Sequence, residues 1–433
     1  MKKFGVLVFA LFMVTAAHGG NWPQWRGPEF NGTSDETNLP TKWSRTENVA
    51  WVAQLPGPSA ATPIVWEDRV FVSTTDLKSE TVKAICLNRK SGKILWQHDI
   101  AKGVNGDYRS TFAAPSPATD GKVVVFFTGK GEMVVYDLDG KKKWSKNFGP
   151  FAFQWTFSTS PVLFDGRLYL QVCQRDKPVR GRGSKDGKNQ SYLLALNPET
   201  GEQLFRQVRP SNALAESLEA FTTPTPYVHN GKKQLLIAGG DCLTSHDPKT
   251  GKEIWRWGTW NPDRIPHWRL VPSPVAGDNI ALVCAPKRDP IYAISTDGKG
   301  QLGEKAVTWD SREARELSSD VPTPAFYDGD FFVLSDVRKN VSRVEPKTGR
   351  VKWSITTPGR SKYEASPTVA DGKIYLINFD GEVAVVNAKT GDLDRVIPMG
   401  PDKRTKYTVR SSVAVAQGQL FIRTVGKLYC IGR

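Results

Sequence analysis

The sequence predicts an all-β fold: an eight-bladed β-propeller of four-stranded antiparallel blades, with the ring closed by an N-terminal strand that completes the last blade. Three observations support this prediction. Ser-Pro or Thr-Pro strand starts recur along the chain, turn glycines are repeatedly followed by an aromatic residue four positions later, and long periodic helical segments are hard to find. Turn formers are abundant, with 38 Gly and 29 Pro in 433 residues. One ring therefore replaces the two or three domains that the length alone suggests.

The first half of the repeated unit is a proline-led strand, a tight turn and a second strand. Residues 116–122 precede the apolar run 123–127, and residues 366–373 precede the run 374–376. The Asp-Gly pairs at these turns supply the positive φ that tight hairpins need. Eight copies of the strand start predict eight blades. They begin at Thr62-Pro63, Ser116-Pro117, Ser160-Pro161, Thr225-Pro226, Ser273-Pro274, Thr323-Pro324, Ser366-Pro367 and, without proline, Ser411-Ser412.

The second half of the unit is a third strand, a glycine turn and an outer strand that carries a large ring. A ring at this position is what packing between blades requires, because it can cover the edge of a neighbouring sheet. Two blades depart from the pattern: an insertion follows Asp297-Gly298 before Trp309 in blade five, and Arg395 replaces the tryptophan in blade seven. The regular pairs are Gly92/Trp96, Gly140/Trp144, Gly201/Phe205, Gly251/Trp255 and Gly349/Trp353.

The eighth unit lacks an outer strand, and the segment 48–55, which contains Trp51, has no blade of its own. Pairing this segment with the last strand of the chain would complete blade eight and remove exposed sheet edges. The strands predicted for the eighth unit cover residues 413–416, 420–423 and 428–431. The expected organisation is a signal peptide over 1–19, an N-terminal segment with the ring-closing strand over 20–56, and the propeller over 57–433.

These repeats resemble those of the pyrroloquinoline-quinone (PQQ)-like repeat propellers. The resemblance rests on the Gly-x-x-x-Trp outer strands, the Ser-Pro starts and the Asp-Gly-Lys-(Ile/Val)-Tyr turns, and it covers about residues 48–433. The opening residues 21–28 are also similar to the start of secreted PQQ-like repeat proteins. A related family member is the propeller component of the outer-membrane β-barrel assembly machinery. The resemblance is strong evidence for the propeller ring but weak evidence for the chemistry of this chain, since one fold hosts many functions.

The N terminus and the charge pattern predict an exported protein, periplasmic or extracellular. Lys2 and Lys3 precede an apolar run over 4–14 and then small residues, which is typical of a secretory signal peptide. No cysteine lies directly after this run, so no lipid anchor is expected. No later apolar stretch is long enough to form a transmembrane segment. The net charge of +15 falls largely at hairpin turns, where it is solvated. We therefore expect no nucleic-acid partner. The expected oligomeric state is a monomer.

The loops that lead into the innermost strands are predicted to surround the mouth of the central channel, because the first strand of each propeller blade faces that channel. Charged and aromatic residues of these loops suit a protein, a peptide or a small polar ligand. The alternative is mutual ion pairing around a water-filled channel. The candidate funnel residues are Arg109, Gln154, Trp155, Glu219, Trp268, Arg269, Asp320, Lys362, Glu364 and Arg410.

The sequence predicts neither a catalytic nor a metal site. The histidines are scattered with no i,i+4 pair, and nucleophile-elbow, P-loop and dinucleotide motifs are absent. The resemblance implies a competing function, because quinoprotein dehydrogenases of this fold use PQQ and calcium and hold the quinone between a tryptophan and a vicinal disulfide. No Cys-Cys pair occurs in this chain. The prediction is a non-catalytic binding scaffold without a cofactor, with the PQQ- and calcium-dependent oxidoreductase as the alternative.

Two features stay open at this point. Cys86 and Cys430 occupy equivalent third strands of adjacent blades, where buried thiols or a disulfide that locks the ring would both fit. The segment 174–188 is polar, basic and rich in glycine, and it lengthens blade three. A flexible surface loop and a contact with an anionic partner both fit this segment.

Overall fold

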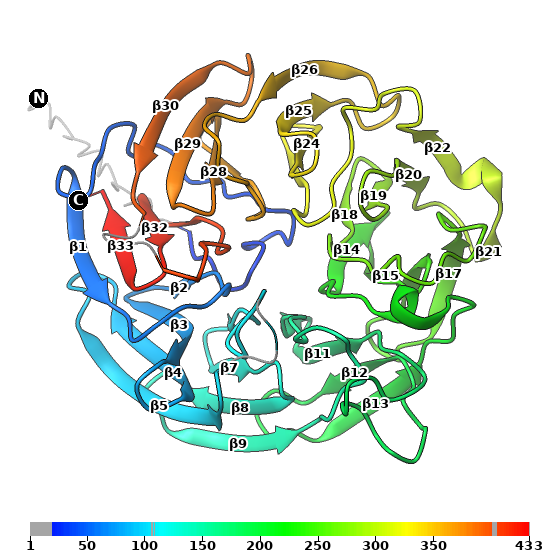
Figure 1. The fold of residues 1–433 in the computed structure, drawn as a ribbon, viewed down its shortest axis with the longest axis horizontal. Helices are drawn as coiled ribbons and strands as arrows, with labels where there is room; N and C mark the ends of the chain where they lie inside the picture. The colour runs from blue at the N-terminus through cyan, green and yellow to red at the C-terminus, as the bar shows by residue number, and fades with distance from the viewer. Residues whose placement is uncertain (1–19, 105–106, 108, 401–404, 433) are drawn as a thin grey trace, which may run out of the picture.

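Eight sheets are arranged around a central channel in the computed structural model, which describes residues 20–104, 107, 109–400 and 405–432 (Figure 1). Helical structure in this part of the chain is confined to two short 3-10 turns, Ala215–Leu218 and Glu304–Ala306. The predicted eight-bladed propeller is confirmed. Within each blade the strands follow one another from the channel to the rim, so the outer strands β5, β9 and β13 lie at the periphery of the ring (Figure 1).

The first four blades each use consecutive strands. Blade one contains β2 (Ile64–Trp66), β3 (Arg69–Asp76), β4 (Thr81–Asn88) and β5 (Ile94–Lys102). Blade two contains β6 (Ala118–Thr119), β7 (Val123–Phe127), β8 (Glu132–Asp137) and β9 (Lys142–Asn147). Blade three contains β10 (Val162–Phe164), β11 (Arg167–Val172), β12 (Tyr192–Leu196) and β13 (Gln203–Val208). Blade four contains β14 (Thr225–His229), β15 (Lys232–Gly239), β16 (Cys242–His246) and β17 (Glu253–Gly258).

The last four blades include the two irregular ones. Blade five contains β18 (Val275–Gly277), β19 (Ile280–Cys284), β20 (Ile291–Ser295) and β22 (Val307–Asp310). Blade six contains β23 (Ala325–Tyr327), β24 (Asp330–Ser335), β25 (Asn340–Val344) and β26 (Val351–Thr356). Blade seven contains β27 (Thr368–Ala370), β28 (Lys373–Ile377), β29 (Glu382–Asn387) and β30 (Leu393–Pro398). Blade eight contains β31 (Ala414–Ala416), β32 (Gln419–Arg423), β33 (Lys427–Ile431) and the N-terminal strand β1 (Val49–Gln54).

The ring closes as the sequence predicts. Strand β1 pairs antiparallel with β33, with Trp51 opposite Cys430 and Gln54 opposite Lys427. This pairing joins the two ends of the propeller, so blade eight has its full set of strands and the last strand of the chain is not left as an edge.

The apolar core lies between the blades. Middle strands such as β7 and β12 are buried along their whole length, because each blade packs between two others and both faces of its sheet are covered. The outer strand β26 alternates instead, with every second side chain exposed. The outer-strand tryptophans extend to the next blade: the indole Nε1 of Trp144 donates to the carbonyl oxygen of Pro198 at 2.8 Å.

The two irregular blades have local explanations. The insertion of blade five forms a short strand, β21 (Gly300–Leu302), which pairs in parallel with β17 and covers the outer edge of blade four at Trp255. In blade seven, where Arg395 replaces tryptophan, the N-terminal segment supplies a buried ring: Trp43 lies 6.5 Å from the ring of Tyr375.

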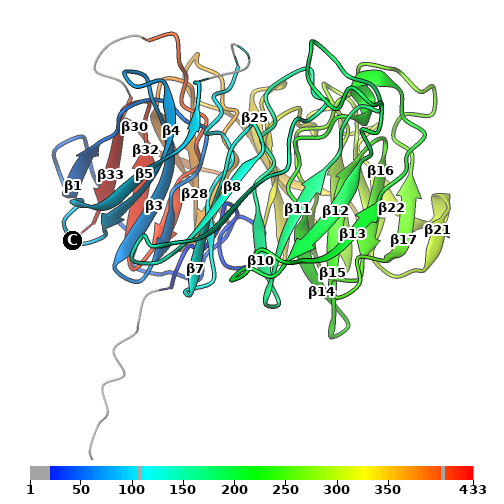
Figure 2. The same ribbon diagram turned by 90° about the horizontal axis from the view of Figure 1, so that it is seen from below.

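Residues 20–48 cross one end of the channel. Trp22 and Val65 of blade one exchange two backbone hydrogen bonds of 2.9 and 2.8 Å. Thr33 bridges Val369 of blade seven, and the Glu36 carboxylate then accepts the amides of Gln417 and Gly418 in blade eight at 2.8 and 2.7 Å. In Figure 2 this dark-blue segment lies toward one face of the ring, opposite the long loop between β11 and β12.

The remaining predictions about chain ends and cysteines have mixed outcomes. The signal peptide expected over 1–19 lies outside the described residues. Within the described residues, no helix has the length and apolar character needed to cross a membrane. Cys86 and Cys430 are buried free thiols in the structure, so the ring is closed by strand pairing without a bond between them.

Candidate functional site

A belt of serine and threonine hydroxyls encircles the channel. Among the described residues, at seven of the eight steps between blades the backbone N–H of one residue donates to the hydroxyl of the equivalent residue in the next blade. Thr62 donates to Ser116 at 3.0 Å, and Ser412 joins blade eight to blade one by donating to Thr62 at 3.2 Å. The steps between them are Ser116 to Ser160 at 3.0 Å, Ser160 to Thr223 at 3.1 Å, Thr223 to Ser273 at 2.9 Å, Ser273 to Thr323 at 2.9 Å and Thr323 to Ser366 at 3.0 Å.

This hydroxyl belt explains the recurring Ser-Pro pairs and corrects one of them. The residue of blade four in the belt is Thr223, followed by Pro224, and not Thr225 as the sequence pattern suggested. The Thr225 hydroxyl donates instead to the carbonyl oxygen of Pro274 in the next blade, at 2.8 Å. Two Thr-Pro pairs follow each other in this blade, and only the belt contacts distinguish them.

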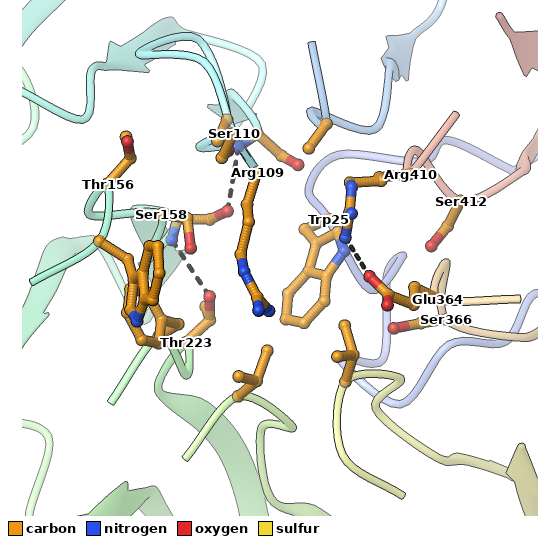
Figure 3. A pocket seen from close by; sticks show the side chains of 18 of the residues that line it. Trp25, Arg109, Ser110, Thr156, Ser158, Thr223, Glu364, Ser366, Arg410 and Ser412 are labelled. Atoms are coloured by element: carbon orange, nitrogen blue, oxygen red, sulfur yellow. Dashed lines mark hydrogen bonds and ion pairs between the residues drawn. The ribbon is translucent and has the colours of Figure 1, made fainter. Parts of the chain in front are cut away.

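The belt forms the wall of a cavity of about 190 Å³ at the centre of the ring. Ser116, Ser160, Thr223, Ser366 and Ser412 face it, and Val271 and Val321 line the side formed by blades five and six. Asp107, Arg109, Trp155, Arg269, Glu364 and Arg410 surround its mouth. In Figure 3 the Arg109 side chain extends into the middle of this cavity.

Trp25 forms the floor of the cavity. It belongs to the N-terminal segment that crosses the channel, and the next residue holds that segment in place. The buried Arg26 guanidinium donates to the carbonyl oxygens of Pro367 at 3.0 Å and Pro324 at 2.9 Å, which lie in blades seven and six. The central space is therefore a funnel that is open at the mouth and closed by an indole at its base.

Ion pairs connect the mouth residues of four neighbouring blades. Arg410 pairs with Glu364, whose other oxygen accepts Lys362 at 2.8 Å. Lys362 also contacts Asp336 at 3.1 Å, and Asp336 accepts the backbone N–H of Asp320 at 2.9 Å. Burial alone would lower the pKa of Lys362, but the Glu364 and Asp336 carboxylates outweigh it and hold that pKa above its usual value. The mutual ion pairing that the sequence left as an alternative is thus present around the mouth.

The same network continues to Trp155. Arg269 contacts Asp320 at 3.4 Å and Glu216 at 4.0 Å. Glu216 in turn accepts the indole N–H of Trp155 at 3.3 Å. Two guanidinium groups stack on the Trp155 ring, Arg109 at 4.9 Å and Arg180 at 5.3 Å from its centroid, which is within the range of a cation–π contact.

Arg180 belongs to the basic segment 174–188, which we call the basic strap. Arg182 of the strap donates to the carbonyl oxygen of Gln154 at 3.4 Å, and Arg175 pairs with the buried Glu219 carboxylate and donates to the Gln154 side chain at 2.9 Å. These arginines contact the protein's own mouth. The strap therefore folds back over the funnel entrance, and three of its cations are engaged there.

Glu219 is the buried anchor of the strap. Its side chain is 0% exposed, and one oxygen accepts both Arg175 and the backbone N–H of Gln154, the latter at 3.0 Å. Burial raises the pKa of Glu219 to about 7, against the lowering effect of Arg175. A carboxylate in such a position keeps its charge near neutral pH only with its cation in place.

The structure brings half of the predicted funnel residues to one cavity. Arg109, Trp155, Arg269, Glu364 and Arg410 line it directly. The other five lie behind this lining: Gln154 and Glu219 hold the strap, Asp320 and Lys362 belong to the ion-pair network, and Trp268 packs against an apolar cluster while its backbone N–H donates to Ser217 at 2.8 Å.

Sequence reasoning missed the floor and the wall of the funnel. Trp25 lies in a segment without a repeat pattern, so nothing in the sequence indicated that it faces the cavity. Asp107 was also missed, although its carboxylate accepts four donors, among them the backbone N–H of Ser110 at 3.0 Å and the Thr156 hydroxyl at 2.6 Å. The hydroxyl belt did have a signal, because a hydroxyl residue precedes proline in nearly every blade start.

The site lacks the vicinal disulfide against which quinoproteins of the competing function hold their quinone. Within the described ranges, no three His, Cys, Asp or Glu side chains lie together as a metal site. The cysteines are five separate buried thiols with no vicinal pair. No chemical step can therefore be assigned to these residues through a bound metal or quinone.

Comparison with known proteins connects the chain to two kinds of propeller. The family model described as outer membrane protein assembly factor BamB matches residues 34–148, 78–298 and 244–433. BamB of Shewanella oneidensis is 23% identical over 69% of this chain and 65% of its own length. Methanol dehydrogenase [cytochrome c] subunit 1 of Methylorubrum extorquens is 24% identical over 25% of this chain. The chain spans about a quarter (26%) of that subunit.

Solved structures show the same two kinds of likeness. A europium-containing methanol dehydrogenase superposes with a TM-score of 0.68 and 12% identity, covering 94% of this chain and 90% of that one. The quinohaemoprotein alcohol dehydrogenase of Comamonas testosteroni gives 0.62 with 14% identity, over 95% and 81% of the two chains. BamB of Moraxella catarrhalis gives 0.58 with 13% identity, over 89% and 97%. At these identities the likeness shows the fold alone.

One expectation is contradicted by these comparisons. The sequence predicted a chain without a cofactor, yet chains that match over 90% and 81% of their own length carry names that state europium, a quinone and haem. The assembly factor has the same ring under a name that states no cofactor. The fold is thus common to both kinds of protein, and it gives no ground for excluding a bound cofactor.

Proposed function

Because the chain belongs to the family described as outer membrane protein assembly factor BamB, we propose that it is a binding propeller that holds a segment of another polypeptide in its central funnel. The funnel residues combine aromatic surface, hydroxyls and charges of both signs around one cavity. Polypeptide segments offer matching groups, since they carry apolar side chains, amides and charges together.

The observation that carries this proposal is the closed floor. Trp25 and the residues around it seal one end of the channel, so whatever enters must come from the mouth and stop at the indole. The eight sheets and the hydroxyl belt hold the wall, which favours a preformed site over one assembled by the ligand. The mouth ion pairs add to this by fixing the rim side chains before a partner arrives.

The same family and the N terminus support a proposal for the location. We propose that residues 1–19 direct export and are removed, and that residues 20–56 and 57–433 then act outside the cytoplasm as one closed ring. The family description, an outer-membrane assembly factor, is consistent with this location.

A peptide selection tests the function. Random 12-residue peptides are selected on the immobilised full chain and then measured in solution against the double variant Trp155→Ala/Arg269→Ala. We expect the selected peptides to lose affinity at least tenfold, because both residues line the funnel mouth. The matched control is Arg312→Ala, an exposed arginine paired with Asp310 at 2.6 Å. Peptides that bind both variants and the parent protein equally would contradict funnel binding.

A second assay addresses the competing oxidoreductase. The purified chain is mixed with PQQ and calcium, and dye reduction is followed with alcohols and sugars as substrates. Stoichiometric PQQ binding with turnover would overturn the polypeptide-binding function. Peptide binding without dye reduction would support it.

A further inference from the structure

The funnel wall has hydrogen-bond donors without acceptors. Five hydroxyls of the belt face the cavity: Ser116, Ser160, Thr223, Ser366 and Ser412. Four of these oxygens accept a backbone N–H from the preceding blade, so each still has its own O–H hydrogen to donate. Among the residues that the structure describes, none accepts a hydrogen bond from any of the five side chains. The wall is thus rich in O–H donors directed at one space.

The acceptors at the same cavity are engaged. Glu364 accepts Arg410 and Lys362, the latter at 2.8 Å. Asp107 accepts the backbone N–H groups of Arg109 at 2.6 Å and Thr156 at 2.5 Å, besides two further donors. Both carboxylates therefore already accept hydrogen bonds within the protein, and three arginines line the cavity against these two carboxylates. A ligand group that enters here meets donors and positive charge.

The closed floor restricts how a polypeptide can enter. Trp25 blocks the base, so a chain cannot thread through the ring and only an end or a side chain can reach the belt. A cavity of about 190 Å³ has room for a terminal residue and not for a folded loop. A C-terminal carboxylate satisfies O–H donors and a guanidinium together, because each of its oxygens accepts more than one hydrogen bond.

We propose that the funnel captures the C-terminal carboxylate of a polypeptide, with the hydroxyl belt and Arg109 around the carboxylate and Trp25 beneath the last side chain. This inference rests on the proposed function and specifies its ligand. A carboxylate can also arrive on a small acid, and the hydrogen bonds to it would be the same. The closed floor and the aromatic base favour the polypeptide end, which brings a side chain for Trp25 to contact.

The test compares two peptides that differ only at their end. Acetyl-Ala-Ala-Phe with a free carboxylate and its C-terminal amide are titrated into the full chain by calorimetry, with succinate as a third probe. We expect the free acid to bind at least tenfold more tightly than the amide and than succinate. Equal affinity for acid and amide would overturn the inference while leaving peptide binding intact. Binding of succinate with no preference for the peptide acid would overturn the polypeptide source.

Removing a single hydroxyl tests the role of the belt in binding separately from general effects on folding. Ser412→Ala removes an O–H at the cavity without removing a side-chain hydrogen bond of the protein, because only the Ser412 backbone N–H takes part in the belt. In this variant the affinity for the free-acid peptide is expected to fall about three- to tenfold, and the affinity for the amide peptide to stay unchanged. Ser73→Ala is the matched control, since the Ser73 hydroxyl is also buried and lacks a partner but does not line the cavity. Equal loss for both peptides in Ser412→Ala, or no loss for either, would contradict the assignment. If neither peptide binds the parent protein, the proposed function fails together with the inference.

Discussion

The indole of Trp96, in the outer strand of blade one, lies against Gly140 of blade two so closely that a Cβ on this glycine would come within 2.6 Å of the ring. The Trp96 N–H also donates to the carbonyl oxygen of Leu138 in the same turn, at 3.0 Å. The repeat therefore acts across blades: a turn glycine receives the ring of the preceding blade, and the tryptophan four residues later packs on the next. Equivalent contacts join Trp51 to Gly92, Trp144 to Gly201, Trp309 to Gly349 and Trp353 to Gly391.

Substitution of Gly140 by alanine should destabilise the propeller. Gly140 has a φ of +87°, and the new methyl group would also overlap the Trp96 ring. We expect a loss of about 2–4 kcal/mol in the free energy of unfolding, measured by urea denaturation. Gly166→Ala is the control, because Gly166 has a similar φ of +71° with nothing within 4 Å of its added Cβ. Gly166→Ala should lower the free energy of unfolding by only about 1 kcal/mol. Equal losses in the two variants would show that packing of the Trp96 indole on Gly140 contributes nothing.

The N-terminal segment should depend on Arg26. Replacing Arg26 by methionine keeps the aliphatic stem but leaves the buried carbonyl oxygens of Pro324 and Pro367 without their donor. We expect a loss of about 2–3 kcal/mol in unfolding free energy and faster proteolysis of residues 20–48. Arg360→Met, at an exposed arginine, provides the comparison. Unchanged cleavage of the segment would mean that its other contacts suffice to hold it.

Asp241 should make the protein less stable as the pH rises. Burial raises the pKa of Asp241 from 3.8 to about 7, although Asn261 donates to its carboxylate at 2.9 Å. A group with a raised pKa in the folded state contributes stability below its unfolded pKa, and this contribution is lost as the pH rises through the folded pKa. Between pH 4 and 7 this loss amounts to roughly 4 kcal/mol at most.

Asp241→Asn should remove that part of the pH dependence. Asparagine tolerates the positive φ of this position, +60°, and cannot ionise. Chemical denaturation at pH 4.5, 6 and 7.5 measures the effect, with Asp328→Asn as the control at an exposed turn aspartate of φ +49°. The same slope of stability against pH in Asp241→Asn and the parent protein would refute the assignment.

The basic strap should open when Arg175 is removed. Arg175→Ala deletes the cation that pairs with the buried Glu219 and with the Gln154 side chain. We expect trypsin to cleave within residues 174–188 at least about tenfold faster, because cleavage follows the open population when opening is fast. Lys90→Ala removes an exposed ion pair with Asp68 and should leave strap cleavage unchanged. Equal cleavage rates in both variants would show that the contacts between the strap and the mouth are dispensable.

Much of the fold was predictable because its signals are local. Asp-Gly and Thr-Gly turns determine hairpins through backbone conformation, and the Gly-to-aromatic spacing marks each outer strand. Ring closure was predictable for the same reason, since segment 48–55 carries a tryptophan strand without a blade and blade eight lacks one. The belt residue of blade four was placed two residues late, because Thr223-Pro224 and Thr225-Pro226 look alike until a neighbouring blade selects one.

The candidate site was only half predictable. Mouth residues such as Trp155 and Arg269 follow from the position of the entry loops in each blade. The basic strap could not be placed, because a glycine-rich polar segment has no apolar face to direct it. Its position depends on Glu219, a residue of the following blade entry that the chain brings beneath Arg175 only after both blades have formed.

The sequence by itself determined the blade, its number of copies and how the ring closes, because turns and strand alternation depend on near neighbours. Only the tertiary structure decided that hydroxyls from successive blades form one belt, and that Trp25 closes the funnel beneath it. The physical reason is that these contacts join residues far apart in the chain, and their geometry exists only once all eight sheets share one axis. The repeated Ser-Pro start, first a sign of architecture, is also the wall of the proposed binding site.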